Sequence, residues 1–213
     1  MKNNEIRKNI LEKSYYLFLE NGFQNTTTRM IAKACEIGTG RLAYYFPKKQ
    51  DILMTLYENY LNNLISFVEE KYKKEHPVVK SYISNLIFYY VYIIDIKSRD
   101  LLYDILSDAK TRKIKIEKTA QMYHRIYEEN QYMDDKQAML NAMIVGAESE
   151  LLFGIRDGLF ELNELEIARS ITKLSYILKE DSSIQELMKR AEELYKNLDK
   201  KEILKMKEQP IFD

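Results

Sequence analysis

Apolar residues recur at steps of three and four along almost the whole chain, the spacing that gives an α-helix one apolar face. The pattern predicts helices over 4–21, 28–35, 39–46, 48–72, 78–96, 99–109, 112–130, 134–156, 163–179 and 183–198. The segment 78–96 is apolar on nearly every side, which indicates a central, buried helix. The predicted fold class is therefore all-α.

Turn residues separate these helices. Gly22 follows the first one, where a left-handed residue ends a helix well, and the threonines at 26–28 offer hydroxyls that cap the second. Pro47 and Pro77 mark further boundaries because a proline ring does not fit inside a helix. The charged segment 201–213 is expected to be a loose tail.

Composition narrows the class of protein. The chain has 213 residues, of which 46% are hydrophobic, so it can bury a core and is not intrinsically disordered overall. Six glycines and three prolines favour helices over an all-β fold. The single cysteine excludes a disulfide within one chain. This length allows one domain or two small ones.

Charge is distributed unevenly although the total is zero. The first 50 residues carry nine basic and four acidic side chains, so the remainder of the chain has the opposite excess of five negative charges. Such asymmetry favours a polyanion-binding end, and chance scatter in a lysine-rich chain is the alternative.

The sequence shows no secretory signal, because the first ten residues are mostly polar. The longest apolar run, 86–94, is too short to span a membrane. We therefore expect a cytoplasmic protein with no membrane partner.

The segment 27–46 has the pattern of a helix-turn-helix. Ala32 supplies the small residue where the two helices touch, and apolar residues surround it at matching spacing: Ile31, Cys35, Ile37, Leu42 and Tyr45. In this motif the second helix is free to enter the DNA major groove with its N-terminal residues at base edges.

Two groups of residues are the candidates for DNA contact. The exposed positions of the second helix are expected at base edges: Thr39, Gly40, Arg41, Ala43 and Tyr44. Arg41 has the geometry to pair bidentately with a guanine. Residues at the ends of the motif are expected at phosphates: Thr27, Thr28, Arg29, Tyr45, Lys48 and Lys49.

Two stretches of the chain resemble the TetR family of transcriptional repressors. The first is Ile10-Leu11-x-x-Ser14-x-x-Leu17-Phe18-x-x-x-Gly22-Phe23. The second is Thr27-x-Arg29-x-Ile31-Ala32, followed by Gly40-x-Leu42-x-Tyr44-Tyr45-Phe46-Pro47-x-Lys49-x-Asp51-Ile52-Leu53. Two residues depart from the family's pattern: Glu36 stands where glycine is frequent, and Ser14 where alanine is frequent.

The resemblance implies an N-terminal three-helix DNA-binding domain over 4–64 and a helical ligand-binding and dimerisation domain over 65–200. It also implies a homodimer whose interface uses the helices predicted at 134–156 and 163–179. The function it implies is a repressor that binds a palindromic operator and is released by a small-molecule effector. The alternative is a helical small-molecule-binding or scaffold protein that does not use its helix-turn-helix. The last helix, 183–198, either pads the dimer interface or covers the pocket.

Aromatic and soft side chains in the second domain are either ordinary core or the lining of a pocket for an apolar or flat aromatic effector. The candidates are Phe88, Tyr89, Tyr92, Tyr103, Met122, Tyr123, Met143 and Glu148, with Tyr90, Met139 and Phe153 nearby. Glu148 has apolar neighbours along its helix and so needs a partner. That partner is a cationic ligand or a basic residue of the second subunit, and we favour the dimer contact.

Nothing in the sequence indicates an enzyme. A glycine-rich phosphate loop and a metal-spaced Cys/His cluster are both missing from the pattern, so neither cofactor nor metal is expected. His124 and Glu128 are four residues apart and fit a surface ion pair. Asp104 and Asp108 share one face of a helix and fit a solvated surface. Cys35 is expected to be a buried structural thiol.

Overall fold

The computed structural model of the chain describes residues 3–127, 135–159, 161–177 and 184–208, and the regular structure in these ranges is entirely helical. The helices are α1 (Asn3–Asn21), α2 (Thr28–Ala34), α3 (Thr39–Tyr45), α4 (Lys49–Lys71), α5 (Pro77–Ile94), α6 (Ile96–Ser107), α7 (Ala109–Tyr127), α8 (Asp135–Arg156), α9 (Glu164–Ile177), α10 (Ile184–Lys196) and α11 (Lys200–Glu208). The all-α prediction is confirmed.

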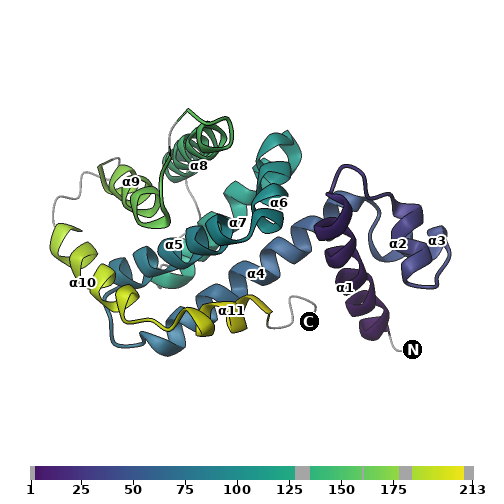
Figure 1. Cartoon of the computed structure of the whole chain (residues 1–213), viewed down its shortest axis with the longest axis horizontal. Coiled ribbons are helices and arrows are strands. Elements are labelled where there is room, and N and C mark those ends of the chain that lie inside the picture. The colour runs from purple at the N-terminus through teal and green to yellow at the C-terminus, as the bar shows by residue number, and fades with distance from the viewer. Residues whose placement is uncertain (1–2, 128–134, 160, 178–183, 209–213) are drawn as a thin grey trace.

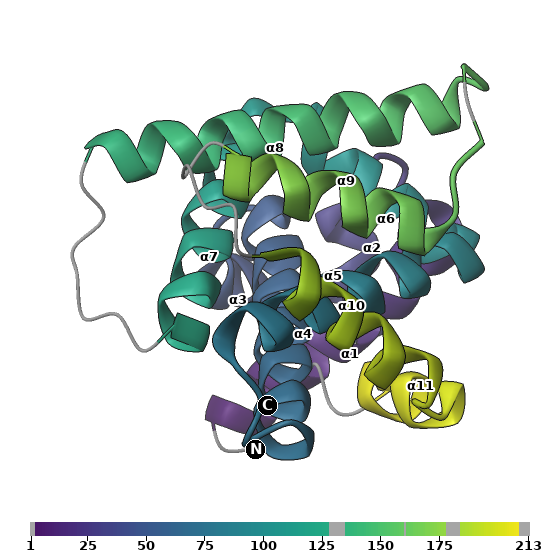
Figure 2. The same cartoon turned by 90° about the vertical axis from the view of Figure 1, so that its left-hand side faces the viewer.

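Helices α1, α2 and α3 form one end of the molecule, and the long helix α4 leads from them into the body (Figure 1). Helix α5 lies in the middle of the body, with α8 and α9 on one side and α10 and α11 on the other (Figures 1 and 2). Because α4 runs unbroken through residue 64, the expected domain boundary falls inside a helix.

The N-terminal end has its own apolar centre. Ile10, Phe18, Ile31 and Leu42 come from three different helices and are at most 1% exposed. The rings of Phe18 and Phe23 meet edge to face with centroids 5.2 Å apart. This centre fixes the angle between α2 and α3, and therefore which residues of α3 face outward.

The turn between α2 and α3 contains a left-handed residue that is not glycine. Glu36, which stands where the family frequently has glycine, has φ 55°. A side chain in this conformation costs about 1–2 kcal/mol. Hydrogen bonds on either side hold the turn, since the Glu36 and Ile37 amides donate to the carbonyls of Lys33 (3.1 Å) and Ala32 (3.0 Å).

Ser14 lies wholly buried on α1, and its hydroxyl has no hydrogen-bond partner among the described residues. We expect Ser14→Ala to raise the free energy of unfolding by about 1 kcal/mol, because it removes a buried unsatisfied group and favours the helix. Urea denaturation measures this gain. Ser149→Ala is the matched control: Ser149 is also a buried helix serine, but its hydroxyl donates to the Val145 carbonyl (2.6 Å). A loss of stability in Ser14→Ala would contradict the expectation.

Helix α5 is buried along most of its length, as its apolar sequence predicts. It ends at Ile94, two residues earlier than expected, because Asp95 accepts a hydrogen bond from the Lys97 amide (3.1 Å) and so caps the start of α6. Helix α10 packs on α5, where its Glu192 accepts hydrogen bonds from Tyr82 of α5 (3.1 Å) and Arg169 of α9 (2.9 Å).

The prediction of a loose tail at 201–213 is wrong for residues 201–208, which belong to α11. Ile203 and Met206 are nearly fully buried against the body, and α11 packs on both α4 and α5. Lys71 pairs with Glu202 across this contact. Charged residues outnumber apolar ones in this segment, and they obscure the two apolar residues spaced three apart, Ile203 and Met206. Residues 209–213 lie outside the described ranges.

By length and composition alone, one helix of the described residues, Ala138–Arg156 within α8, is apolar enough to cross a membrane. Only 44% of that window is buried inside the structure. Part of the apolar surface of α8 therefore remains uncovered in the single chain.

Candidate DNA-binding surface and ligand cavities

The α2–α3 unit presents one continuous exposed surface. Eight of the residues expected at DNA are exposed on this surface: Thr27, Thr28, Arg29, Thr39, Gly40, Arg41, Ala43 and Tyr44. Lys48, which follows α3, is exposed as well. Tyr44 is the most prominent of these, with 77% of its surface accessible. Thr27 also caps α2 by accepting a hydrogen bond from the Met30 amide (3.2 Å). The exposed threonines, Arg41 and Tyr44 supply hydrogen-bond donors of the kind that contact DNA.

Two residues expected at phosphates are instead engaged within the protein. The Tyr45 hydroxyl donates to Asn3 Oδ1 (2.9 Å) at the start of α1. The Lys49 ammonium donates to the carbonyl oxygens of Phe23 (2.6 Å), Gln24 (3.3 Å) and Thr26 (2.8 Å). These three bonds use all the donors of the ammonium, so this geometry does not support a phosphate contact by Lys49. Lys49 holds the loop between α1 and α2 against α4.

Helix α6 connects the N-terminal end to the body. Asp104 accepts a hydrogen bond from Gln24 Nε2 (3.3 Å), in the loop that follows α1. Burial raises the pKa of Asp104 although this hydrogen bond opposes the shift. Asp104 is half-buried, so it lies only partly on the solvated face that the sequence predicts. Asp108, by contrast, caps α7 by accepting from the Lys110 and Thr111 amides, both at 3.0 Å.

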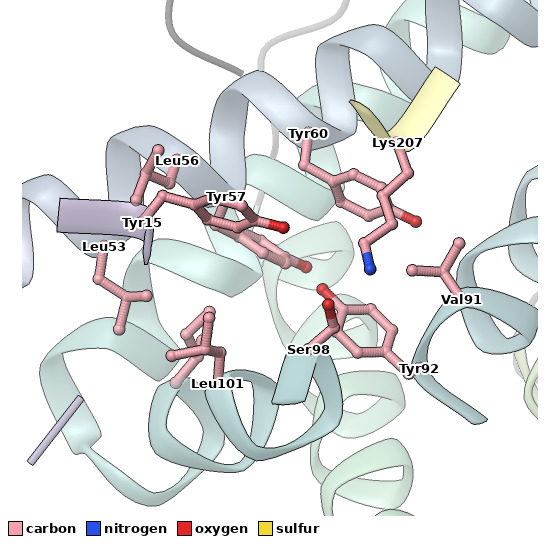
Figure 3. A pocket seen from close by; sticks show the side chains of 11 residues that line it. Tyr15, Leu53, Leu56, Tyr57, Tyr60, Val91, Tyr92, Ser98, Leu101 and Lys207 are labelled. Carbon is pink, nitrogen blue, oxygen red and sulfur yellow. The ribbon is translucent and has the colours of Figure 1, made fainter. Parts of the chain in front are cut away.

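A first cavity of about 60 Å³ lies between the two parts of the molecule (Figure 3). Its walls come from α1, α4, α5 and α6, and tyrosines are prominent among them: Tyr15, Tyr57, Tyr60 and Tyr92. The Tyr60 hydroxyl is buried without a hydrogen-bond partner among the described residues. Because Tyr15 belongs to α1, this cavity reaches the DNA-binding end directly.

Lys207 closes one side of the first cavity from α11, and its ammonium points into the space (Figure 3). It pairs with the carboxylate of Asp95, which also accepts a hydrogen bond from the Ser98 hydroxyl (2.7 Å). Burial acts to raise the pKa of Asp95, but the hydrogen bonds from Lys207 and Ser98 outweigh it and the pKa is lowered. The cation of α11 is thus held at the cavity by a neighbouring carboxylate.

A second cavity, of about 30 Å³, contains a buried ion pair. Lys115 of α7 donates to Glu148 of α8, and the two residues are 2% and 5% exposed. The Tyr89 hydroxyl donates to the other carboxylate oxygen of Glu148 (2.9 Å). The partner of Glu148 is therefore a lysine of the same chain. Our preference for a partner in the second subunit is wrong, and the cationic-ligand alternative is not needed.

A third cavity, of about 360 Å³, lies between α5, α6, α8 and α9. Arg99 and Tyr103 of α6 line it, together with Tyr89 and Tyr92 of α5. Tyr92 also lines the first cavity and Tyr89 the second, so tyrosine rings form the walls between neighbouring cavities. Rotation of these rings would join neighbouring cavities or separate them.

Five of the predicted pocket residues line these cavities: Phe88, Tyr89, Tyr92, Tyr103 and Glu148. Met143 does not, because it is 49% exposed on the outer face of α8. The side chains of Met122 and Tyr123 lie outside the described part of the structure, as does that of His124. The basic residues Arg99, Lys115 and Lys207 were missed, since basic positions in amphipathic helices usually face solvent.

Cys35 is buried as expected, and its thiol is 3.9 Å from the Asn9 carbonyl. Burial raises the pKa of this thiol to about 11, although Lys13 nearby opposes the shift. The thiolate is therefore scarce at neutral pH, which fits a structural role.

This geometry defines a class of protein: a helical body with internal cavities that carries an exposed helix-turn-helix. Residues 10–55 match the family described as bacterial regulatory proteins, tetR family. This segment, which contains α2 and α3, is therefore similar to the N-terminal part of that family. An HTH-type transcriptional regulator of Bacillus subtilis (strain 168), YuxN, is 36% identical over 56 residues. That match covers 26% of this chain and 19% of YuxN, so the chain spans about a fifth of that relative.

Similar solved structures extend the likeness to the body. Thermus thermophilus FadR, a TetR-family transcriptional repressor solved with lauroyl-CoA, matches with a TM-score of 0.60 at 18% identity. The match covers 84% of this chain and 96% of FadR. RolR without ligand matches with a TM-score of 0.59 at 15% identity, over 87% of this chain and 96% of RolR. At these identities the comparison shows that most of the chain shares the fold of these two structures.

Proposed function

We propose that the protein is a homodimeric transcriptional repressor that binds a palindromic operator and releases it when a small molecule occupies the body. The observation that carries the proposal is the exposed outer face of α3, where Thr39, Arg41 and Tyr44 all face solvent. Charge supports it, because the first 50 residues have an excess of five basic side chains. A repressor of this kind acts in the cytoplasm.

The outer face of α8 supports a dimer. Four exposed residues near its N-terminal half are small or apolar and recur at helical spacing: Met139, Ala142, Met143 and Gly146, with Met139 and Met143 about half exposed. The charged exposed residues Glu150 and Arg156 lie nearer its C-terminal end. A surface of this kind on a soluble protein marks an interface. A twofold axis across α8 and α9 would form a four-helix contact. The two copies of α3 would then meet half-sites about one helical turn, ~34–36 Å, apart.

The position of the cavities supports control by a ligand. The first cavity is bounded by α1 of the DNA-binding domain, and α6 both lines two cavities and contacts the α1–α2 loop through Asp104. A ligand that prefers the arrangement unable to bind DNA lowers operator affinity, by about 5- to 150-fold for ordinary coupling free energies. The similar structure of Thermus thermophilus FadR was solved with lauroyl-CoA, so a protein of this fold can hold a ligand.

Selection of random duplex DNA by the purified protein, at two salt concentrations, tests the proposal. We expect a palindromic motif whose affinity falls steeply with salt, because neutralised phosphates release counterions. Weak binding without a motif, even at low salt, would favour the alternative of a ligand-binding or scaffold protein with an unused helix-turn-helix.

Arg41 gives the residue-level test on the selected duplex. We expect Arg41→Ala to weaken binding about 5- to 150-fold and to relax sequence preference at one base pair of each half-site, since a bidentate guanine contact contributes about 1–3 kcal/mol. Fluorescence anisotropy measures both effects. Lys196→Ala removes the same charge from the exposed surface of α10 and is the control. Equal losses in the two variants would contradict a specific base contact.

A further inference from the structure

The cavity between α5, α6, α8 and α9 contains two polar groups that the protein leaves unsatisfied. Of the four buried side-chain atoms without a hydrogen-bond partner among the described residues, two are Arg99 Nε and the Tyr103 hydroxyl. Both residues line this one cavity. Buried polar atoms are nearly always paired, so two orphans in one hollow indicate a missing partner.

Both orphaned groups are hydrogen-bond donors, and one is permanently charged. The Nε–H of a guanidinium only donates, and a phenol donates to an anion readily. An unpaired buried donor costs about 1–3 kcal/mol, and more when it is charged. The atom that satisfies both groups is therefore an acceptor with negative charge. A cationic ligand is excluded here because it would lie against Arg99.

The rest of the cavity is apolar and large enough for a small molecule. Leu102, Leu152, Ile155 and Ile167 contribute aliphatic surface, and Tyr89 and Tyr92 contribute rings. About 360 Å³ falls at the small end of the range for ligand sites. The single acidic residue in the lining, Glu161, is exposed and forms no ion pair with Arg99 in the described structure.

We infer that this cavity binds an organic acid with an apolar body, whose carboxylate accepts hydrogen bonds from Arg99 and Tyr103. The binding step stands on the cavity alone, whereas its regulatory consequence rests on the proposed function. Tyr103 is followed on α6 by Asp104, which contacts Gln24 of the DNA-binding domain. An acid held by Arg99 and Tyr103 therefore acts on the helix that joins the body to that domain.

Matched acids and amides test the ligand class. The full-length protein, free of DNA, is titrated by calorimetry with 2-naphthoate, 2-naphthamide, decanoate and decanamide. We expect at least one acid to bind ten-fold or more tightly than its amide, because only the carboxylate pairs with the guanidinium. The body shape of the better acid then tells a flat ligand from a linear one. Equal affinity for acid and amide, or no binding of either acid, would overturn the inference.

Three variants locate the binding. Arg99→Met is expected to abolish the preference for the acid while leaving amide affinity unchanged, and Tyr103→Phe to weaken acid binding several-fold. Arg156→Met is the control, because Arg156 lies 5.5 Å from the Tyr103 ring but is exposed and paired with Asp157. Thermal melts establish that each variant is folded. An unchanged preference in Arg99→Met, or its loss in Arg156→Met, would refute the assignment.

Addition of the better acid to the protein bound to its selected duplex separates this inference from the proposed function. Acid binding through Arg99 with a drop in operator affinity supports both. Acid binding through Arg99 with no change in operator affinity, or with no DNA binding at all, supports the site and contradicts the ligand-responsive repressor.

Discussion

Replacing Lys115 by methionine is expected to lower the free energy of unfolding by about 3–5 kcal/mol, because it leaves Glu148 as an uncompensated buried charge. Both residues of the pair are almost fully buried. The Tyr89 hydroxyl also donates to the carboxylate, 2.9 Å from Oε1. Typical domains are stable by 5–15 kcal/mol, so this single change removes a large share of the total. Urea denaturation at 25 °C measures the loss.

Two further variants show whether the loss comes from the stranded charge. Lys115→Met combined with Glu148→Gln keeps an acceptor for Tyr89 but removes both charges, and we expect it to recover most of the stability. Lys118 lies on the same helix as Lys115 and forms a partly exposed pair with Glu58 of α4. Lys118→Met breaks this pair and should cost less than about 1 kcal/mol. A cost for Lys115→Met no greater than for Lys118→Met would refute the buried-pair interpretation.

Met143→Glu is expected to convert the proposed dimer to a monomer. A twofold interface places each substituted residue in the contact twice, so the change introduces two desolvated carboxylates. Uncompensated charges at an interface cost several kcal/mol, or about 100-fold and more in the dissociation constant. Operator affinity is expected to fall when the dimer dissociates, because a monomer reaches one half-site only. Light scattering after size-exclusion chromatography measures the mass.

Met143→Leu is the control for that substitution, since it keeps an apolar side chain of similar volume and should leave the dimer intact. Met143 is half exposed in the single chain, so neither variant is expected to disturb the fold of the protomer. A Met143→Glu protein that stays dimeric at low micromolar concentration would place the interface on a surface other than α8.

Local patterns were sufficient for most of the helices and for the helix-turn-helix, but not for the α5–α6 break or for α11. The N-cap at Thr27 and the helix start at Pro77 depend on residues within a few positions of each other, so the sequence predicts them well. The boundary between α5 and α6 at Asp95 was missed because the residues on both sides of Asp95 are apolar. The boundary is marked by the Asp95 side chain, which caps α6. The tail was misjudged because α11 is short and mostly charged, and its helix depends on docking against α4 and α5.

The sequence by itself determined that the chain is all-α and that α2 and α3 form an exposed helix-turn-helix with Thr39, Arg41 and Tyr44 outward. Periodicity and turn chemistry are local, so they can be read along the chain. Only the tertiary structure decided how distant charges pair and which remain unpaired. Lys115 meets Glu148 and Lys207 meets Asp95 across 33 and 112 positions of sequence, while Arg99 is left facing a cavity. Such partners are set by helix packing, and no spacing rule along the sequence specifies them.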